Sequence, residues 1–281
     1  MITDSTPEEQ RRFPQLETLL LWEGRLNNAR LRELFGLSSP RASVWIRELR
    51  EARPDWLSWE PRSRSFVATP AAYAAGSATA SLERYIGIVG LSGGLEPFTS
   101  SNALQAGFPA LVTPPPEVFG PVNRATHAGV PIEILYMSLQ HPEPHVRVIH
   151  PHSLVRTDQR WHVRAFCEKN RDFRDFNLSR IRQVRLRELE RATPAAQDVA
   201  WHTLVQVRFV AHPELPDPQA KVIRMEYFSG AGSRVETCRA ALVHYFVKSV
   251  QAAVEPTRQV PPDYVLAVFN AEELKSWLFP G

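Results

Sequence analysis

The chain has 281 residues, of which 43% are hydrophobic and 22% are charged, a balance that excludes global disorder and allows more than one domain. No apolar run approaches the roughly 20 residues that span a bilayer, and the first 12 residues lack a signal-peptide pattern, so we expect a cytoplasmic protein without membrane contact. The cysteines Cys167 and Cys238 are too few for a disulfide framework and lack zinc-site spacing, so we expect neither a metal nor another cofactor.

The net charge of +3 is unevenly distributed along the chain. Residues 131–195 carry 12 basic and 8 acidic side chains, whereas residues 1–70 carry 11 and 10. Almost all the basic groups are arginines, whose planar guanidinium suits phosphate recognition. A GC-rich genome would produce the same bias without any function, and composition alone leaves both interpretations open.

Breaks in composition predict four segments. Residues 1–70 form the first, residues 71–128 a connector, residues 129–192 a central domain and residues 193–281 a C-terminal domain. The connector is poor in charge and rich in proline, glycine and alanine, so we expect short helices and turns there without a separate core. Early in the central domain, residues 132–139 and 146–149 alternate as strands do.

The first segment contains two helical patterns joined by a tight turn. Residues 28–35 have apolar side chains at helical spacing and are followed by Gly36, which readily takes the left-handed conformation that ends helices. Ser39 then has the features of an N-cap, with Pro40 at the first helical position. This order predicts a helix-turn-helix. The apolar face of the second helix consists of Ala42, Trp45, Ile46 and Leu49.

The opposite face of the second helix has chemistry suited to a DNA major groove. An arginine can bond the O6 and N7 atoms of guanine, a serine can bond a phosphate or a base, and Val44, expected to be exposed, can meet a thymine methyl group. Residues 56–60 and 65–68 predict a hairpin with a basic tip, the wing, whose arginines contact phosphates. A helical protein-interaction module with a solvated basic face is the alternative. The expected DNA-binding residues are Ser39, Pro40, Arg41, Ser43, Val44, Arg47, Arg50, Arg62 and Arg64.

The central domain contains further strand patterns with cations among apolar residues. Along residues 161–166, apolar side chains alternate with His162 and Arg164, so one face is core and the other carries cations. Arg174 and Arg180 share the parity of apolar neighbours, and a cation beside a core requires an anionic partner. That partner is either a nearby carboxylate or the phosphate of a ligand. The nearby carboxylates are those of Glu168, Asp172 and Asp175.

The segments 150–155, 160–167 and 173–181 together resemble the WYL domain, with Trp161-His162-Val163 at the name-giving triplet, so only the tryptophan is retained. Segments 22–25 and 35–38 extend the likeness over nearly the whole chain, which is similar to defence-island repressors of the BrxR and CapW type. The resemblance implies an α+β multidomain fold: an N-terminal winged helix-turn-helix, a central small β-barrel of the Sm or SH3 kind, and a small C-terminal α+β domain.

The resemblance also implies a function. It predicts a sequence-specific transcription regulator, a homodimeric repressor of a phage-defence operon that binds an inverted repeat in double-stranded DNA and is relieved by a nucleotide or nucleic-acid effector. A WYL-type activator switched on by its ligand is the alternative. Tyr136 and Ser138, expected on the first strand, are carried over as effector-binding residues. The others are His150, His152, Arg160, Trp161, His162, Arg164, Arg174 and Arg180, with Trp161 expected in the core rather than stacked on a ligand.

The C-terminal domain shows no catalytic motif, so a structural or dimerising role is expected there. Residues 204–209 and 264–269 predict strands, and residues 218–228, 240–253 and 271–278 predict helices. We expect no enzyme. A metal-dependent phosphodiesterase is the remote alternative, because four histidines lie within twelve residues, but their spacing matches no zinc pattern and no carboxylate pair accompanies them. These histidines are His141, His145, His150 and His152.

Overall fold

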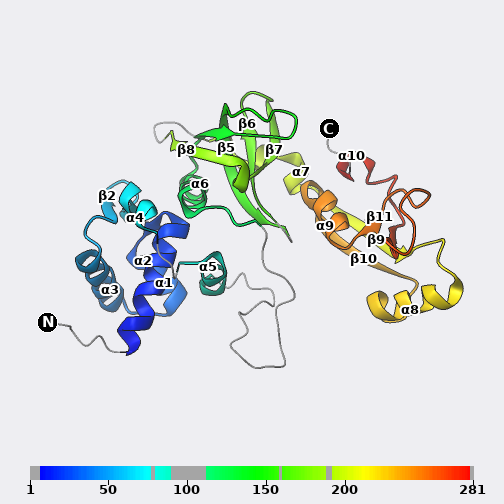
Figure 1. The fold of residues 1–281 in the computed structure, drawn as a ribbon, viewed down its shortest axis with the longest axis horizontal. Coiled ribbons are helices and arrows are strands. Elements are labelled where there is room, and N and C mark those ends of the chain that lie inside the picture. The colour runs from blue at the N-terminus through cyan, green and yellow to red at the C-terminus, as the bar shows by residue number, and fades with distance from the viewer. Residues whose placement is uncertain (1–6, 77–79, 90–111, 158–159, 188–191, 279–281) are drawn as a thin grey trace. The chain divides into compact units, whose positions relative to one another are not determined.

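A computed structural model of the chain describes residues 7–76, 80–89, 112–157, 160–187 and 192–278. The chain divides into two compact units, residues 1–193 and residues 194–281 (Figure 1). The first unit contains the winged helix, the connector and the central sheet, and the second contains the C-terminal domain. Among the described residues, no helix is both long and apolar enough to cross a membrane.

The first unit begins with a winged helix-turn-helix. Its helices are α1 (Pro7–Glu23), α2 (Asn28–Phe35) and α3 (Ser39–Ala52), and its strands are β1 (Arg25–Leu26), β2 (Leu57–Glu60) and β3 (Ser65–Ala68). The strands form an antiparallel sheet in the order β1-β3-β2, in which β2 and β3 are the wing. The predicted helix pair and hairpin are confirmed, whereas the sequence patterns do not predict α1 or β1.

The start of α3 differs from the prediction by one residue. Ser38, not Ser39, precedes the helix in an extended conformation, and its side chain makes no capping hydrogen bond. Ser39 is the first helical residue, and its hydroxyl donates to Asn28 Oδ1 over 3.3 Å. Pro40 stays in the first turn, where a missing N–H costs nothing because those N–H groups have no partner within the helix.

The connector forms short helices, as expected, but they share a core with both neighbours. These helices are α4 (Pro70–Ala75), α5 (Leu82–Ile88) and α6 (Pro116–Ala128), and residues 90–111 of the expected connector lie outside the described residues. The ring of Phe119 in α6 lies 5.2 Å from that of Trp22 in α1 and 5.1 Å from that of Trp161 in the central sheet. Helix α6 therefore joins the winged helix to the sheet in one continuous core (Figure 1).

The central sheet is antiparallel, with strand order β7-β6-β5-β4-β8. The strands are β4 (Ile132–Tyr136), β5 (His145–Arg156), β6 (Trp161–Cys167), β7 (Asp172–Asn177) and β8 (Ile181–Leu186). The two edge strands are joined only by the 3-10 turn η1 (Leu178–Arg180), a link that spans at most about 14 Å, whereas a flat five-stranded sheet would separate its edges by about 19 Å. The sheet must therefore curl, as the expected small barrel requires.

The first strand of this sheet is shorter than predicted. It ends at Tyr136, so Ser138 does not lie on it. The Ser138 hydroxyl instead accepts a hydrogen bond from the His141 N–H over 3.0 Å, and the Ser138 N–H donates to the His141 carbonyl over 2.9 Å. Such bonds between a short polar side chain and nearby backbone favour a turn over a strand. The next strand, β5, is correspondingly longer than the predicted 146–149.

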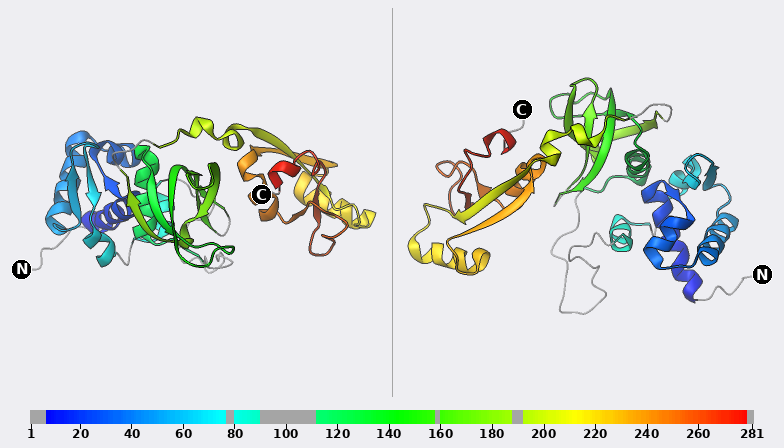
Figure 2. Two further views of the ribbon diagram at one scale, coloured as in Figure 1. Left: turned by 90° about the horizontal axis from the view of Figure 1, so that it is seen from above. Right: turned by 180° about the vertical axis from the view of Figure 1, so that it is seen from behind.

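The second unit is a four-stranded sheet with helices packed on it. Its elements include β9 (Leu204–Ala211), α8 (Asp217–Phe228), β10 (Ser233–Arg239), α9 (Val243–Ser249), β11 (Ala252–Ala253), β12 (Leu266–Val268) and α10 (Lys275–Leu278), preceded by α7 (Val199–His202). The strand order is β10-β9-β12-β11, and β9 and β10 form a long antiparallel ribbon (Figure 2). The sequence does not predict β10. The helix expected over 240–253 is confirmed only over Val243–Ser249, because a 3-10 turn precedes it and a short strand follows it.

Helices α1 and α6 meet backbone to backbone. A Cβ added to Gly120 of α6 would lie 2.5 Å from the carbonyl oxygen of Leu21 and 2.6 Å from Tyr73 Oη. One added to Gly24, which has a φ of 69°, would lie 2.7 Å from the carbonyl oxygen of Gly120. Since these distances are shorter than any real Cβ contact, the two glycines set how closely the helices can approach.

We predict that Gly120→Ala lowers the free energy of unfolding by about 2 kcal/mol, because an overpacked site costs more than the helix propensity gained. Gly87→Ala in α5 is the matched control, because a Cβ there meets nothing within 4 Å, and it should be neutral or stabilising by up to about 1 kcal/mol. Denaturant unfolding of both variants checks the pair. Equal stability of the two variants would contradict the close-approach argument.

Candidate functional site

A groove of about 670 Å³ separates α3 from the wing. The apolar face of α3 is buried, as predicted, so its polar face is left toward this groove. Among the residues predicted to bind DNA, Pro40, Arg41 and Arg62 are exposed outside the groove lining, and Val44 is half-buried rather than exposed. The groove brings together the remaining five, which are Ser39, Ser43, Arg47, Arg50 and Arg64.

Two adjacent asparagines hold the two walls of the groove. Asn27 caps α2 by accepting from the Arg30 N–H over 2.9 Å, and its amide donates to the hydroxyl of the buried Ser65 in the wing over 3.0 Å. The amide of Asn28 donates to the carbonyl of Ser39 over 2.7 Å and to the hydroxyl of Ser43 over 2.8 Å. The start of α2 therefore fixes both the wing and the N-terminal turn of α3. The sequence analysis missed this role, which depends on contacts across the fold.

An aromatic stack positions one arginine in the groove. The guanidinium of Arg50 lies 4.8 Å from the centre of the Phe66 ring, and Phe66 packs against Trp59 at 4.9 Å. A cation over an aromatic face is stabilised by the ring's quadrupole. Trp59 is 52% exposed and lines the groove, although it shares strand parity with Leu57 and its sequence pattern therefore indicates core. No sequence signal identifies Trp59 as part of this surface.

Arg47 projects from the centre of α3 with little restraint. Its Nε lies 3.9 Å from Glu51 Oε1, and the two side chains are 63% and 70% exposed. An exposed pair of this kind is worth less than about 1 kcal/mol, so Arg47 can exchange Glu51 for another acceptor at small cost. At the wing, Arg64 adopts a positive φ of 50° in the turn that begins at Pro61. Within the described residues, the arginines that line the groove are paired with carboxylates weakly or not at close range. An anion that enters the groove could therefore bind them.

The central sheet has a core face and a cationic face, as expected. On β6, Trp161, Val163 and Ala165 are buried in the core. The opposite face is also largely buried, because His162 is 7% exposed and Arg164 is 8% exposed. Arg164 lies opposite Asp175 on β7, with Nη1 and Oδ1 3.4 Å apart. The cationic face is thus covered and partly neutralised by the sheet's own carboxylate.

Three of the predicted effector-binding residues interact around His162. Burial lowers the pKa of His162 to about 4, and the positive charges of Arg160 and Arg180 lower it as well. Arg160 precedes β6 and Arg180 ends the turn before β8, so the curled sheet brings them to one histidine. His162 is therefore neutral at pH 7, in a site with positive potential.

Three other predicted effector-binding residues have partners of their own in the first unit. His150 donates from Nε2 to Glu168 over 3.0 Å and accepts at Nδ1 from the Thr193 N–H over 2.8 Å, so both ring nitrogens hold the fold. His152 bonds the Ser153 hydroxyl, and Arg174, on the opposite face from Arg164, lies 3.9 Å from Asp172.

Tyr136 links two strands of the curled sheet. It is 7% exposed, and its hydroxyl accepts from the Asn177 N–H over 3.4 Å, which links β4 to the end of β7. Its ring packs edge-on against Phe176 at 5.2 Å. Trp161 is similarly buried against Phe119, in agreement with its expected place in the core.

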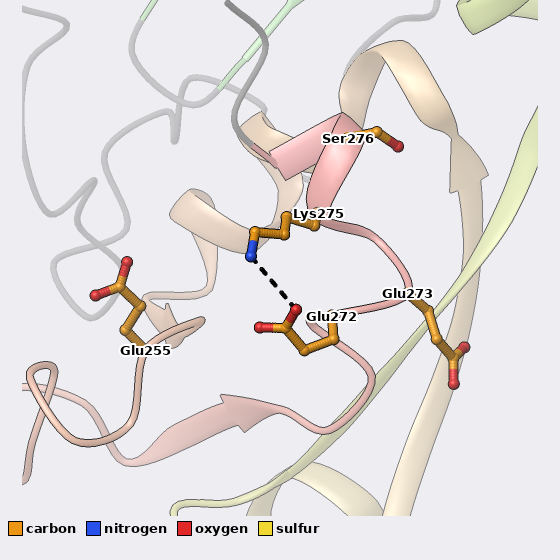
Figure 3. Close-up of a pocket in the computed structure, with 5 residues that line it drawn as sticks. All are labelled: Glu255, Glu272, Glu273, Lys275 and Ser276. Atoms are coloured by element: carbon orange, nitrogen blue, oxygen red, sulfur yellow. Dashed lines mark hydrogen bonds and ion pairs between the residues drawn. The ribbon is translucent and has the colours of Figure 1, made fainter.

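The histidines and a hollow in the second unit are the other places that could serve as sites. Within the described ranges, no group of three or more histidine, cysteine, aspartate or glutamate side chains is placed to hold a metal ion. A hollow of about 750 Å³ in the second unit is lined mainly by carboxylates, and Figure 3 shows Lys275 reaching to Glu272, 3.5 Å away. Its acidic lining does not suit an anionic ligand. The lining consists of Glu255, Glu272, Glu273, Lys275 and Ser276.

Three family models match the chain in order. Residues 8–89 match the BrxR transcriptional regulator winged helix-turn-helix domain, residues 117–186 the WYL domain, and residues 204–274 the BrxR transcriptional regulator C-terminal dimerization domain. The WYL match begins inside α6, so this helix belongs to the sheet domain as well as to the predicted connector.

Curated relatives match over almost the full length of the chain. The DNA-binding transcriptional repressor CapW of Pseudomonas aeruginosa is 31% identical over 275 residues, which cover 95% of this chain and 91% of that protein. The CapW repressor of Escherichia coli (strain KTE188) is 31% identical, with 96% and 92% covered, and that of Stenotrophomonas maltophilia is 28% identical, with 96% and 92% covered.

These relatives are transcriptional repressors, so the phosphodiesterase alternative is set aside. The three matched domains coincide with the winged helix-turn-helix, the curled sheet with its helix, and the C-terminal α+β domain described above. The chain therefore belongs to the CapW family of DNA-binding transcriptional repressors.

Proposed function

We propose that this chain binds an inverted repeat in double-stranded DNA as a homodimer, represses a phage-defence operon, and leaves the DNA when an anionic effector, a nucleotide or nucleic acid, occupies the WYL domain. The groove between α3 and the wing carries the proposal, because exposed arginines from both elements converge on it. The walls of the groove are fixed by hydrogen bonds to Asn27 and Asn28, so little ordering is needed on binding. The relatives are repressors, which supports repression rather than activation.

An uncovered sheet face in the second unit supports the homodimer. Leu204, Val235 and Phe269 are 63%, 45% and 66% exposed, and the strand register places them on one face with Arg208. The guanidinium of Arg208 lies 5.4 Å from the centre of the Phe269 ring. Large apolar side chains gathered on a sheet face are typical of an interaction surface, and this face lies within the segment that matches a dimerization domain. A dimer would present α3 twice to an inverted repeat.

The cluster around His162 supports an anionic effector. Arg160 and Arg180 lower the pKa of His162, which shows that their charges act on this site. A phosphate placed there would offset the positive potential of the two arginines and the cost of a partly buried cation. We assign effector contact to Arg160, His162 and Arg180 first, and treat the remaining effector residues as the wider lining.

The DNA-binding proposal predicts different effects for an arginine of α3 and an arginine of the wing. Arg47→Ala should weaken binding to the operator by about 1 to 3 kcal/mol and reduce discrimination against a scrambled duplex, because it removes a base contact. Arg62→Ala should weaken operator and scrambled duplex alike and lower the salt dependence by about one unit of slope, because it removes a phosphate contact. Fluorescence anisotropy with duplexes from the region upstream of the coding sequence measures both.

The unmodified protein decides the proposal first. If it binds no inverted repeat from that region at moderate salt, the repressor proposal is wrong. An operator that lies upstream of the promoter, with transcription increased by the protein, would instead support an activator.

The dimer proposal predicts that Phe269→Asp weakens self-association by about 30-fold, because a charge replaces a large exposed apolar side chain of the face. Leu139→Asp is the matched control, since Leu139 is 80% exposed in the first unit and outside that face. Sedimentation velocity over a concentration series measures both. An unchanged dimer in Phe269→Asp would remove this face from the interface.

The His162 site predicts a pH effect on stability. The folded-state pKa of about 4 lies below the ordinary histidine value of 6.5, so between these values the unfolded state binds more protons and the protein loses stability as the pH falls. Between pH 7 and pH 5 the free energy of unfolding should fall by about 1 kcal/mol, once the screening of charges by solvent is taken into account. His162→Gln should lack this fall, whereas His127→Gln should keep it. Parallel curves of unfolding free energy against pH for the wild type and His162→Gln would contradict the assignment.

A further inference from the structure

One carboxylate of the wing contacts both the tip turn of the wing and a helix of the WYL domain. Glu60, the last residue of β2, accepts from the Ser63 hydroxyl at one oxygen, inside the turn that carries the wing arginines. Its other oxygen, Oε1, accepts from Arg124 Nη2 in α6 over 2.7 Å. The side chains of Arg124 and Glu60 are 19% and 24% exposed, so this ion pair is largely shielded from solvent.

The helix that carries Arg124 is held firmly on its other sides. The amide of Asn123 donates to the carbonyl of Trp22 over 3.1 Å at the end of α1, and Phe119 packs on Trp161, the neighbour of His162 on β6. Helix α6 also packs against β5 and β8. Arg124 is therefore a side chain of the WYL domain that reaches the wing from a rigid support.

From this geometry we propose that Arg124 is a positioning residue for DNA binding. Through Glu60 it holds the wing at the angle at which Arg62 and Arg64 reach the phosphates, and it makes the wing move with the WYL helix. This inference rests on the proposed DNA-binding function. Arg124 itself need not touch DNA.

The geometry distinguishes this role from simple stabilisation. Asn27 anchors β3 through Ser65, the residue that pairs with Glu60 across the hairpin, whereas the tip turn is bonded to β2 through Glu60. Without Arg124, the charge that fixes the Glu60 carboxylate is lost while the Asn27 anchor remains. The fold should then persist with a less ordered wing tip. Loss of the Arg124 charge should therefore weaken DNA binding only when Arg62 and Arg64 are present.

The test is a double-mutant cycle in the full-length protein, with the duplex that the wild type binds. Arg124→Gln should weaken binding about fivefold in the wild-type background, and by less than about twofold in a variant that already carries Arg62→Ala and Arg64→Ala. Glu60→Gln should reproduce both results. Arg185→Gln is the control for the loss of one positive charge, since Arg185 is exposed on β8 of the WYL sheet. This variant should leave the affinity within about twofold of the wild type.

Rescue by charge reversal gives a second readout. Glu60→Arg combined with Arg124→Glu should recover at least half of the affinity lost in Arg124→Gln, measured in logarithmic units. Equal losses with and without the wing arginines, or an affinity unchanged in both Arg124→Gln and Glu60→Gln, would overturn the inference while leaving DNA binding by the wild type intact. If Arg124→Gln does not fold, Glu60→Gln decides by the same criteria. Failure of the wild type to bind DNA would instead reject the proposed function.

Discussion

The close approach of α1 and α6 determines how the first unit is built. Gly24 and Gly120 let the two backbones touch, and Asn123 then reaches the carbonyl at the end of α1. Helices this close cannot slide without breaking that hydrogen bond or exposing the aromatic cluster around Phe119. The winged helix and the WYL sheet therefore share one core, although their sequences match two separate families.

This shared core constrains how an effector could influence DNA binding. Trp161 adjoins His162 on β6 and packs against Phe119, so a movement of this end of β6 would act on α6. Because packed helices tend to shift between discrete arrangements rather than deform gradually, a change at β6 would move α6 as a body. Both walls of the groove are bonded to the start of α2, and the wing is also bonded to α6 through Glu60. A shift of α6 would therefore act on the wing more directly than on α3.

Local signals predicted the helix-turn-helix because Gly36 and Pro40 act on their own neighbours. They missed α1 because it contains Pro14 and buries four leucines together with Trp22, so it has no clear polar face. They also missed the roles of Asn27, Asn28 and Trp59, which depend on contacts between residues distant in sequence. The error at Ser138 has a local origin, because a strand pattern does not show that this serine will bond to His141, three residues later.

The charge distribution shows why composition could not locate the proposed DNA-binding surface. The largest basic excess lies in residues 131–195, yet within that segment Arg164 is paired with Asp175 and Arg174 lies near Asp172. Residues 1–70 are nearly neutral overall, but Arg50 is held over an aromatic ring and Arg47 faces only an exposed, distant Glu51. Attraction to a polyanion depends on charge that is exposed and weakly paired, since a neutralised pair contributes little field beyond a Debye length of about 8 Å. An arginine's nearest carboxylate, which only the fold determines, therefore matters more for DNA binding than the number of arginines in its segment.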